Sequence, residues 1–211
     1  MSIADIRTEY KLATLSEDEV AINPIEQFAR WWEEAINSEI PEVNAMTLST
    51  ASKLGRPSSR IVLLKGYDEQ GFVFFTNYES RKGQDIAENP NVSLLFFWKE
   101  LERQIRIDGT VTKVTVEESD EYFASRPKGS KIGAWASPQS QVIATRHLLE
   151  KRSAGYEMEF KGDDIPRPEH WGGYRVKPFR IEFWQGRENR LHDRIQYEWQ
   201  SKGWIRSRLA P

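Results

Sequence analysis

The sequence predicts a mainly β protein in which an antiparallel sheet closes into a barrel and helices flank it. Short apolar runs with strand-like alternation outnumber the helical patterns, and most follow one another through short turns. Closing about seven strands into a barrel is the economical way to remove exposed sheet edges. The chain of 211 residues, 38% of them hydrophobic, is long enough to bury a substantial core.

The first part of the chain is polar. Residues 1–20 are predicted to be an arm, either mobile or docked as a short helix, and residues 21–211 to form a single domain. A helix over residues 24–37 begins at Asn23-Pro24, with Asn as N-cap and Pro at the first helical position. Its apolar stripe at helical spacing is Ile25, Phe28, Trp32 and Ile36.

Strand-like alternation replaces this helical period from residue 44. Turn-rich sequences such as Lys53-Leu-Gly-Arg-Pro57 and Tyr67-Asp-Glu-Gln-Gly71 separate the runs. Strands are expected at residues 46–50, 59–65, 72–76, 92–98, 103–116, 174–184, 190–199 and 204–208. Helices are expected over residues 81–89, 117–125 and 139–160, with loops over 126–138 and 162–171.

Composition excludes several classes of function. A net charge of -2 argues against a general nucleic-acid binder, because such a protein needs a basic face. Without cysteine there is no disulfide, thiolate nucleophile or cysteine-ligated metal, and His147, His170 and His192 are too far apart for a short-spaced metal motif. No apolar run reaches the length of a membrane span, and the first residues lack a signal-peptide pattern. We therefore expect a cytoplasmic protein that needs no metal.

The most informative segment is Trp184-Gln-Gly-Arg-Glu-Asn-Arg-Leu-His-Asp-Arg194, which reads as a hairpin with its turn at residues 186–189. Alternation on an outgoing strand that starts at residue 190 places Arg190, His192 and Arg194 on one face, near Trp184. Such a patch suits a flat, anionic, conjugated ligand. The alternative is a solvated edge whose arginines deter aggregation. Asp193 falls on the opposite, apolar face, where alternation gives it no role.

Two segments could hold a phosphate group. Arg60 and Lys65 close the ends of an apolar strand, but simple alternation puts them on opposite faces, so joint use requires a bulge or the strand ends. The junction that carries Ser80, Arg81 and Lys82 leads from a strand into a helix, where backbone N–H groups attract anions. The alternatives are the charged ends of a core strand and a solvated first helical turn.

Two further segments could complete a site. Gln104 and Arg106 share one strand face, so Gln104 could bond the polar edge of a ring, although an ordinary exposed face explains them too. Tyr122 and Arg126 lie one helical turn apart and, with Ser130, could accept a second phosphate; a plain helix end with a favourable arginine is the alternative. Separate cation-and-hydroxyl sites without a paired acid and base indicate chemistry supplied by a phosphorylated cofactor.

Taken together and in this order, the segments resemble the pyridoxamine 5'-phosphate oxidase family. The resemblance covers the chain from residue 24 to its end, whereas the first residues match only through Arg7 and Glu9-Tyr10. The motifs that carry it are Arg60-Ile-Val-Leu-Leu-Lys65, Phe75-Thr-Asn77 with Ser80-Arg-Lys82, Asn89-Pro-Asn-Val-Ser-Leu-Leu-Phe96, Glu102-Arg-Gln104, Tyr122-Phe-Ala-Ser-Arg-Pro127, Ile132-Gly-Ala-Trp135, Trp171-Gly-Gly173, the stretch from Ile181 to Arg194, and Arg208-Leu-Ala-Pro211.

The resemblance implies a split β-barrel that binds FMN at a homodimer interface. It implies oxidation of pyridoxamine or pyridoxine 5'-phosphate to pyridoxal 5'-phosphate, with hydride transfer from substrate C4' to flavin N5 and reduction of O2 to H2O2. The residues implied to hold FMN are Arg60, Ile61, Val62, Leu63, Leu64, Lys65, Phe75, Thr76, Arg81, Lys82, Gln104, Gln139, Ser140, Trp184 and Arg194. Those implied to hold the substrate are Arg7, Tyr10, Lys65, Tyr122, Arg126, Ser130, Arg190, Leu191 and His192, with Arg190 and His192 catalytic.

One departure from the family pattern is Phe75, where the family often has Tyr; a contact made by the backbone would be unaffected. Two alternative functions stay open. A related split-barrel flavin enzyme would not need Arg126, Ser130, Arg190 and His192 together. A non-catalytic module that binds flavin or pyridoxal phosphate would release no H2O2 when pyridoxine phosphate is added.

Overall fold

The computed structural model describes residues 2–3 and 9–211, so the role predicted for Arg7 lies outside the described residues. The strands are β1 (Ala45–Ala51), β2 (Pro57–Leu63), β3 (Gly66–Asp68), β4 (Gly71–Asn77), β5 (Asn91–Trp98), β6 (Arg103–Lys113), β7 (Trp171–Gln185), β8 (Asp193–Gln200) and β9 (Gly203–Arg208). The helices are α1 (Pro24–Asn37), α2 (Arg81–Glu88), α3 (Val116–Ser125), α4 (Lys128–Ala136) and α5 (Arg146–Glu159), with short 3-10 turns η2 (Lys99–Leu101) and η3 (Glu188–Arg190).

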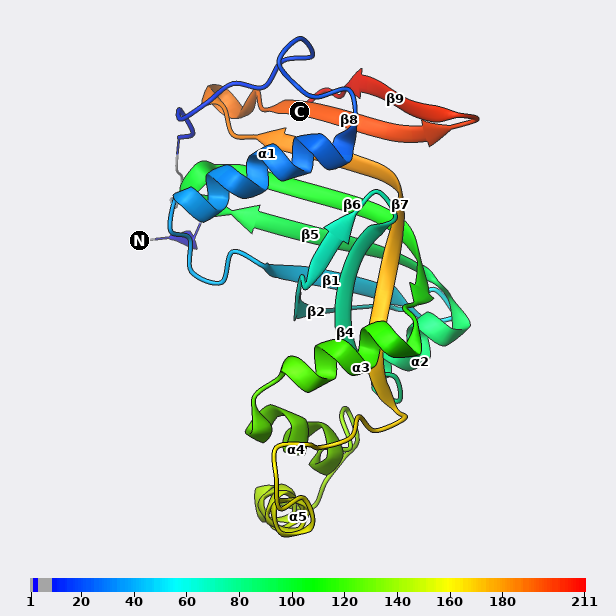
Figure 1. The fold of residues 1–211 in the computed structure, drawn as a ribbon. Helices are drawn as coiled ribbons and strands as arrows, with labels where there is room; N and C mark the ends of the chain where they lie inside the picture. The colour runs from blue at the N-terminus through cyan, green and yellow to red at the C-terminus, as the bar shows by residue number, and fades with distance from the viewer. Residues whose placement is uncertain (1, 4–8) are drawn as a thin grey trace. The chain divides into compact units, whose positions relative to one another are not determined.

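The strands form one sheet in the order β2-β1-β5-β6-β7-β4-β3, and β8 pairs with β7 and β9 (Figure 1). The pairs β3–β4, β4–β7, β7–β8 and β8–β9 are antiparallel. A mainly antiparallel sheet with flanking helices is therefore confirmed. None of the helices in the described ranges is both long enough and apolar enough to cross a membrane.

The chain divides into two compact units. The first comprises the chain up to residue 48 together with residues 93–109 and 178–211, and the second comprises residues 49–92 and 110–177. Strands β1, β5, β6 and β7 each contribute residues to both units. The predicted division into an arm, residues 1–20, and one domain, residues 21–211, stays a prediction.

Helix α1 of the first unit begins and ends where the sequence predicts. The side chain of Asn23 accepts a hydrogen bond from the backbone N–H of Ile25 at 2.8 Å, and Pro24 occupies the first turn. The local signals of the cap therefore suffice to place this helix.

The second half of the buried face of α1 is shifted by one residue from the prediction. Ile25 and Phe28 are buried as expected, but Trp31 and Ala35 complete the face, whereas Ile36 is 50% exposed. Because apolar residues are adjacent at 31–32 and 35–36, the sequence allows either stripe. The sheet decides, since Phe28 packs on Phe96 of β5 and Trp31 on Phe183 of β7.

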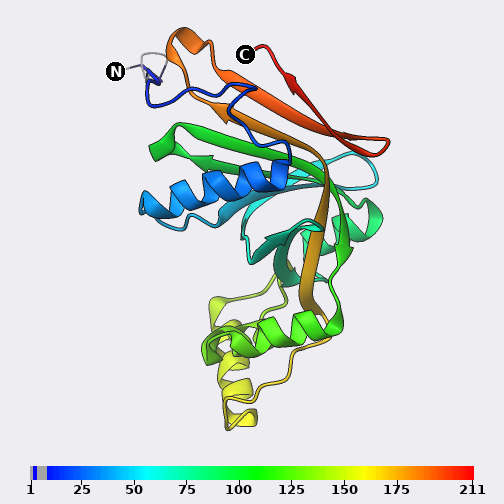
Figure 2. The ribbon, with the colours of Figure 1, turned by 45° about the horizontal axis from the view of Figure 1, so that its top comes forward.

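In the second unit the segment 126–145 departs most from the prediction. Helix α4 lies where the sequence predicts a loop, and α5 begins at Arg146 instead of residue 139. Gly129 and Gly133 lower the helix propensity of α4, and packing overrides it. Ile132 is buried, and the Trp135 ring packs against Tyr156 and Phe160, which bring α5 alongside α4 (Figure 2).

Candidate functional site

A pocket of about 810 Å³ in the second unit gathers most of the residues predicted to bind phosphate. It lies where β2 and β4 end and where α2, α3 and α4 meet them. The predicted residues that line it are Arg60, Ile61, Val62, Leu63, Lys65, Phe75, Thr76, Lys82, Tyr122, Arg126, Ser130 and Gln139. Leu64, Arg81 and Ser140 are not among the lining residues, so their contacts with FMN stay predictions.

The end of β2 explains how Arg60 and Lys65 line the same pocket. The strand stops at Leu63 instead of residue 65, so strict alternation no longer applies to Lys65. The backbone N–H of Lys65 donates to the carbonyl oxygen of Val73 at 2.8 Å, while Leu64 is buried in the core at 4% exposure. Use of the strand end, one of the two arrangements that the sequence allows, is therefore the one adopted.

The guanidinium of Arg60 is held against one wall of the pocket. Its Nη1 donates to Thr50 Oγ1 and its Nη2 to Ser58 Oγ, each at 2.8 Å. Thr50 in turn donates to Asp85, whose carboxylate lies 4.0 Å from the guanidinium. Burial lowers the pKa of Arg60, and the attraction of Asp85 opposes that shift. Neutral hydroxyls, with Asp85 at a longer distance, thus orient the guanidinium against the pocket wall.

Lys82 supplies a second buried cation, from the first turn of α2, where Ser80 is the N-cap. Its Nζ donates to Thr76 Oγ1, Ser80 Oγ and Gln139 Oε1 at 3.2, 3.3 and 3.0 Å, all of them neutral acceptors. Burial, and next the positive charge of Arg60, lower the pKa of Lys82 to about 8. An anion bound beside these two cations would relieve that cost.

Arg126 provides a third cation at the end of α3. Its guanidinium lies over the indole of Trp171 at 4.4 Å, and burial lowers its pKa. Its Nη1 is buried without a hydrogen-bond partner in the described part of the chain. A buried, unsatisfied donor on a charged group is costly, so this atom indicates a ligand oxygen.

Stacked aromatic rings form another wall of the pocket. The rings of Phe75 and Tyr122 stack at 4.0 Å, and those of Phe75 and Trp171 at 5.7 Å. A Cβ at Gly173 would lie 2.7 Å from the Phe75 ring, which explains a glycine there. Trp171 is a lining residue that the sequence analysis did not assign, although the Trp171-Gly-Gly173 motif contained the signal.

The hairpin of the first unit carries the second predicted cluster, but its turn is longer than predicted. Strand β8 begins at Asp193, so an outgoing strand from residue 190 is wrong in its first three residues. Asn189 and Arg190 adopt left-handed conformations with φ of 55° and 62°, which no strand allows. Arg190 therefore lies in the turn, and Leu191 is 69% exposed instead of facing the core.

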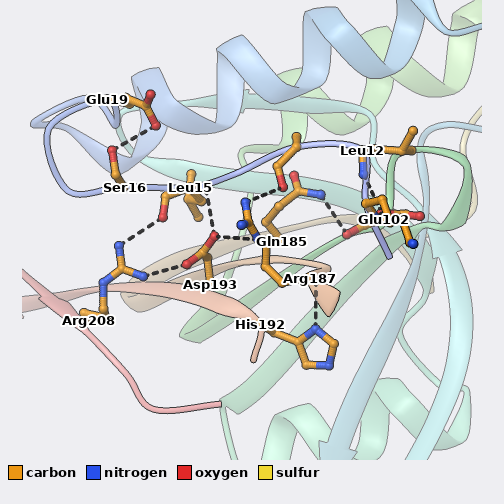
Figure 3. Close-up of polar contacts among 12 residues, drawn as sticks. Leu12, Leu15, Ser16, Glu19, Glu102, Gln185, Arg187, His192, Asp193 and Arg208 are labelled. Atoms are coloured by element: carbon orange, nitrogen blue, oxygen red, sulfur yellow. Dashed lines mark hydrogen bonds and ion pairs between the residues drawn. The ribbon is translucent and has the colours of Figure 1, made fainter. Parts of the chain in front are cut away.

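His192 is oriented by the same turn (Figure 3). The backbone N–H of Arg187 donates to His192 Nδ1 at 3.1 Å, so the neutral ring carries its proton on Nε2. The ring packs on Trp184 at 4.6 Å, as the sequence predicts for this pair. Burial, and next the charge of Arg190, lower the pKa of His192 and favour this neutral form.

Two residues at the start of β8, Arg194 and Asp193, each form an ion pair. Arg194 lies opposite Trp184 in the register and binds both carboxylate oxygens of the buried Glu182. Asp193, to which alternation gives no role, accepts hydrogen bonds from Leu15 N–H at 3.1 Å and from Arg208 at 2.8 Å (Figure 3).

The described part of the arm docks on this hairpin in a non-helical conformation. The Tyr10 ring meets the rings of Trp184 and His192 edge-on at 5.7 and 5.9 Å. The backbone N–H groups of Lys11 and Leu12 donate to Glu102 Oε2 at 2.8 and 3.0 Å. Residues 10–12 are thus docked without being helical, and the choice between a mobile arm and a docked helix over residues 1–20 stays a prediction.

Gln104 behaves as the alternation predicts. It lies half-buried on β6, on the face opposite the fully buried Ile105 and Ile107. The predicted site residues thus fall into two groups, a pocket group in the second unit and a hairpin group in the first. Cations around an aromatic wall, carried by an antiparallel sheet, are typical of proteins that bind anionic aromatic ligands.

Comparison with known proteins gives the family. Residues 32–158 match the model of pyridoxamine 5'-phosphate oxidase, and residues 171–211 match the pyridoxine 5'-phosphate oxidase C-terminal dimerisation region. Proteins of Paraburkholderia phymatum and Bordetella pertussis, both named pyridoxine/pyridoxamine 5'-phosphate oxidase, are each 58% identical to this chain. The match covers 100% of this chain and 99% and 100% of the two relatives, respectively. The chain belongs to the pyridoxamine 5'-phosphate oxidase family and is an oxidoreductase.

Solved structures agree with this assignment. PhzG from Burkholderia lata, in complex with tetrahydrophenazine-1-carboxylic acid, has a TM-score of 0.90 and 30% identity, covering 97% of this chain and 100% of its own. An FMN binding protein from Nostoc punctiforme, related to pyridoxamine 5'-phosphate oxidase, has a TM-score of 0.71 and 15% identity over 91% of this chain and 100% of its own, a likeness of fold alone. The predicted split-barrel fold is confirmed.

Proposed function

We propose that this protein is an FMN-dependent oxidase that converts pyridoxamine 5'-phosphate or pyridoxine 5'-phosphate to pyridoxal 5'-phosphate in the cytoplasm. One observation carries the proposal most: the pocket of the second unit combines three cations with a stacked aromatic wall. A flat ring that bears a phosphate satisfies both parts at once. The names of the relatives supply the substrate class.

The residues present fit FMN. Lys82 is a desolvated ammonium with neutral acceptors, so a phosphate would offset the cost of its burial, and Arg60, oriented by hydroxyls, lines the same pocket. The family likeness assigns residues of both units to the flavin. Those of the second unit are Arg60 to Lys65, Phe75, Thr76, Arg81, Lys82, Gln139 and Ser140, and those of the first are Gln104, Trp184 and Arg194.

A second phosphate has its own donors. Lys65, Tyr122, Arg126 and Ser130 line the pocket together, and the buried Nη1 of Arg126 is the donor that most requires an acceptor. We assign these residues to the phosphate of the substrate. Arg190, Leu191 and His192, with Tyr10 of the arm, are assigned to its pyridine ring, because the indole, imidazole and phenol rings of Trp184, His192 and Tyr10 already pack together.

Positioning is the main contribution of the chain to catalysis. FMN, when bound, would supply the two-electron chemistry, taking a hydride from substrate C4' at N5 and reducing O2 to H2O2; with pyridoxamine 5'-phosphate, water then replaces the amino group, which leaves as ammonia. Arg190 holds the pyridine ring and favours charge that develops on it. His192, neutral with a proton on Nε2, offers a hydrogen-bond donor to the substrate. Arg194 would contribute positive charge beside the flavin and so favour the uptake of electrons there.

The match to a dimerisation region supports a homodimer. Two apolar residues of β2 that line the pocket, Ile61 and Leu63, are 63% and 36% exposed in the single chain. We propose that the second copy covers this edge and that FMN lies at the interface between the copies.

Release of H2O2 tests the function. We expect the FMN-loaded protein to release H2O2 with pyridoxine 5'-phosphate or pyridoxamine 5'-phosphate, and to respond poorly to unphosphorylated pyridoxine, because the Arg126 donor is then left unpaired. If the protein releases no H2O2 with either phosphorylated substrate, the alternative of a non-catalytic binding module is favoured. A response to tetrahydrophenazine-1-carboxylic acid alone would favour the related flavin enzyme that the likeness to PhzG allows.

A further inference from the structure

The motif Arg208-Leu-Ala-Pro211 has no role in the proposed function, yet its backbone contacts a residue assigned to FMN. Beyond the end of β9, the backbone N–H of Leu209 donates to the carbonyl oxygen of Arg194 at 2.9 Å. The carbonyl oxygen of Ala210 accepts from Arg194 Nη1 at 2.8 Å. The segment 208–211, which we term the tail, thus binds both the main chain and the side chain of Arg194.

Glu182 completes the enclosure of the Arg194 guanidinium. Its two carboxylate oxygens accept from Nε at 2.8 Å and from Nη2 at 3.1 Å, a bidentate pair of fixed geometry. Glu182 is only 5% exposed, and its hydrogen bond raises the pKa of Arg194. Each nitrogen of the guanidinium therefore has a defined acceptor, two of them on Glu182 and one on the tail.

These bonds leave Arg194 able to serve a ligand. A guanidinium carries five N–H groups, and the three bonds leave one on Nη1 and one on Nη2. Arg106 also contacts Glu182, at 3.4 Å, so two guanidinium groups share one carboxylate and the three side chains keep a net positive charge. The pairing therefore fixes the direction of Arg194 without cancelling its charge.

The tail is itself anchored. Arg208 donates to Asp193 at 2.8 Å and to the carbonyl oxygen of Leu15 at 3.0 Å, and it forms an ion pair with Glu17 (Figure 3 shows the first two contacts). Pro211 restricts Ala210 to extended conformations. Contacts with Asp193, which precedes Arg194, and with Leu15 and Glu17 of the arm thus hold the tail in place.

We propose that the tail and Glu182 act as positioning residues that hold Arg194 in its FMN-binding orientation. The inference rests on the proposed function, because it takes Arg194 as a flavin contact. It explains why a segment outside the pocket would matter to cofactor binding: a guanidinium that must be ordered on binding loses affinity through side-chain entropy.

A matched pair of substitutions at Leu209 isolates the tail. Leu209→Pro and Leu209→Ala both shorten the side chain, but only proline removes the N–H that binds Arg194. The extended conformation that proline imposes on Arg208 suits the end of a strand. FMN affinity is measured by quenching of flavin fluorescence on titration of the apoprotein, and thermal melting of the apoprotein confirms folding.

We expect Leu209→Pro to weaken FMN binding about tenfold and Leu209→Ala less than about twofold. Loss of the bond between Leu209 N–H and the Arg194 carbonyl oxygen releases the tail, and with it the charge-assisted bond from Arg194 Nη1 to the Ala210 carbonyl oxygen. Glu182→Gln should weaken it to a similar degree. In an Arg194→Ala background, which itself binds FMN at least about tenfold more weakly, neither Leu209→Pro nor Glu182→Gln should weaken binding further.

Two results would overturn the inference while Arg194 stays a flavin contact: equal affinities for the two Leu209 variants, or an equal loss with Leu209→Pro in the presence and absence of Arg194. If Arg194→Ala leaves FMN affinity unchanged, the inference falls with the assignment of Arg194. Wild-type protein that still binds FMN and releases H2O2 would then show that the proposed function stands without it.

Discussion

The pocket of the second unit and the hairpin of the first treat their cations in opposite ways. In the pocket, Lys82 is surrounded by hydroxyl and amide acceptors, and Arg126 has a buried nitrogen without a partner in the described residues. In the hairpin, Arg194 is paired with Glu182 and Arg208 with Asp193 and Glu17. The pocket therefore keeps charge for a ligand, whereas the hairpin uses charge to fix its own geometry.

The difference separates two tasks. Buried cations with neutral neighbours destabilise the free protein and gain most from an anion, so they serve binding. Ion-paired residues around His192 and Arg190 hold a constellation in place, so they serve orientation. Variants of Lys82 and Arg126 in the pocket should then change affinity, and variants of Arg190 in the turn of the hairpin should change turnover.

The largest effect is expected at Arg190. Replacement of Arg190 by Lys should lower kcat about 100-fold, because the planar fork that holds the pyridine ring is lost. Steady-state kinetics with pyridoxine 5'-phosphate measure it. The matched control is Arg146→Lys on α5, because the side chain of Arg146 is 89% exposed. This variant should keep the kcat of the wild type. An unchanged kcat for Arg190→Lys would remove the hairpin from the chemistry.

Arg126 should show the opposite kinetic pattern. Replacement of Arg126 by Ala should raise KM at least about tenfold with little change in kcat, since a charged phosphate donor is lost. The same kinetics measure it, and Arg146→Ala is the control. The melting temperature of the apoprotein should fall little, because the deleted group has an unsatisfied nitrogen. A loss confined to kcat would contradict a phosphate-anchoring role.

Lys82 predicts how FMN affinity depends on pH. Its pKa of about 8 in the free protein should rise when a phosphate binds, so affinity should fall by up to about tenfold per pH unit above pH 8. Fluorescence titrations between pH 7 and 10 measure the slope, and Lys82→Met should flatten it. An identical slope in that variant would assign the titration to another group.

Lys82 should affect folding in the opposite sense. Between its folded pKa near 8 and its unfolded pKa, the unfolded state binds more protons, so this group makes the apoprotein more stable as pH rises. Denaturant unfolding at the two ends of this window gives a control that does not involve the cofactor.

The smallest effect concerns His192. Arg190→Ala should raise the pKa of His192 toward its ordinary value, because one of the two causes that lower it is removed. NMR titration of the imidazole protons measures it. Since the folded pKa of wild-type His192 is depressed, its contribution to stability is lost as pH falls. A His192 pKa that ignores Arg190 would mean that the two side chains do not share a site.

Local signals allowed accurate prediction where a few neighbouring residues decide the structure. Helix α1 follows from Asn23-Pro24, and the grouping of Gln104 opposite Ile105 follows from alternation on β6. Helix α4 does not follow from local signals, because Gly129 and Gly133 disfavour a helix that burial of Ile132 stabilises.

In the candidate site, the residue types were predictable and their partners were not. Cations beside hydroxyl groups in the sequence predict Arg60, Lys82 and Arg126 as anion-binding residues, and all three line the pocket. The contact of Arg126 with Trp171 and the bond of Asp193 to Leu15 join segments far apart in the chain, and no local pattern encodes them. The turn at Asn189 and Arg190 depends on left-handed conformations that alternation cannot express.

The most direct test is the absorption spectrum of the protein with FMN during one turnover. We predict a yellow protein whose flavin band is bleached by pyridoxamine 5'-phosphate in the absence of oxygen and restored by air, with one pyridoxal 5'-phosphate formed per flavin. A protein that takes up no FMN, or one whose bound flavin stays oxidised with this substrate, would contradict the proposal that this protein is an FMN-dependent oxidase.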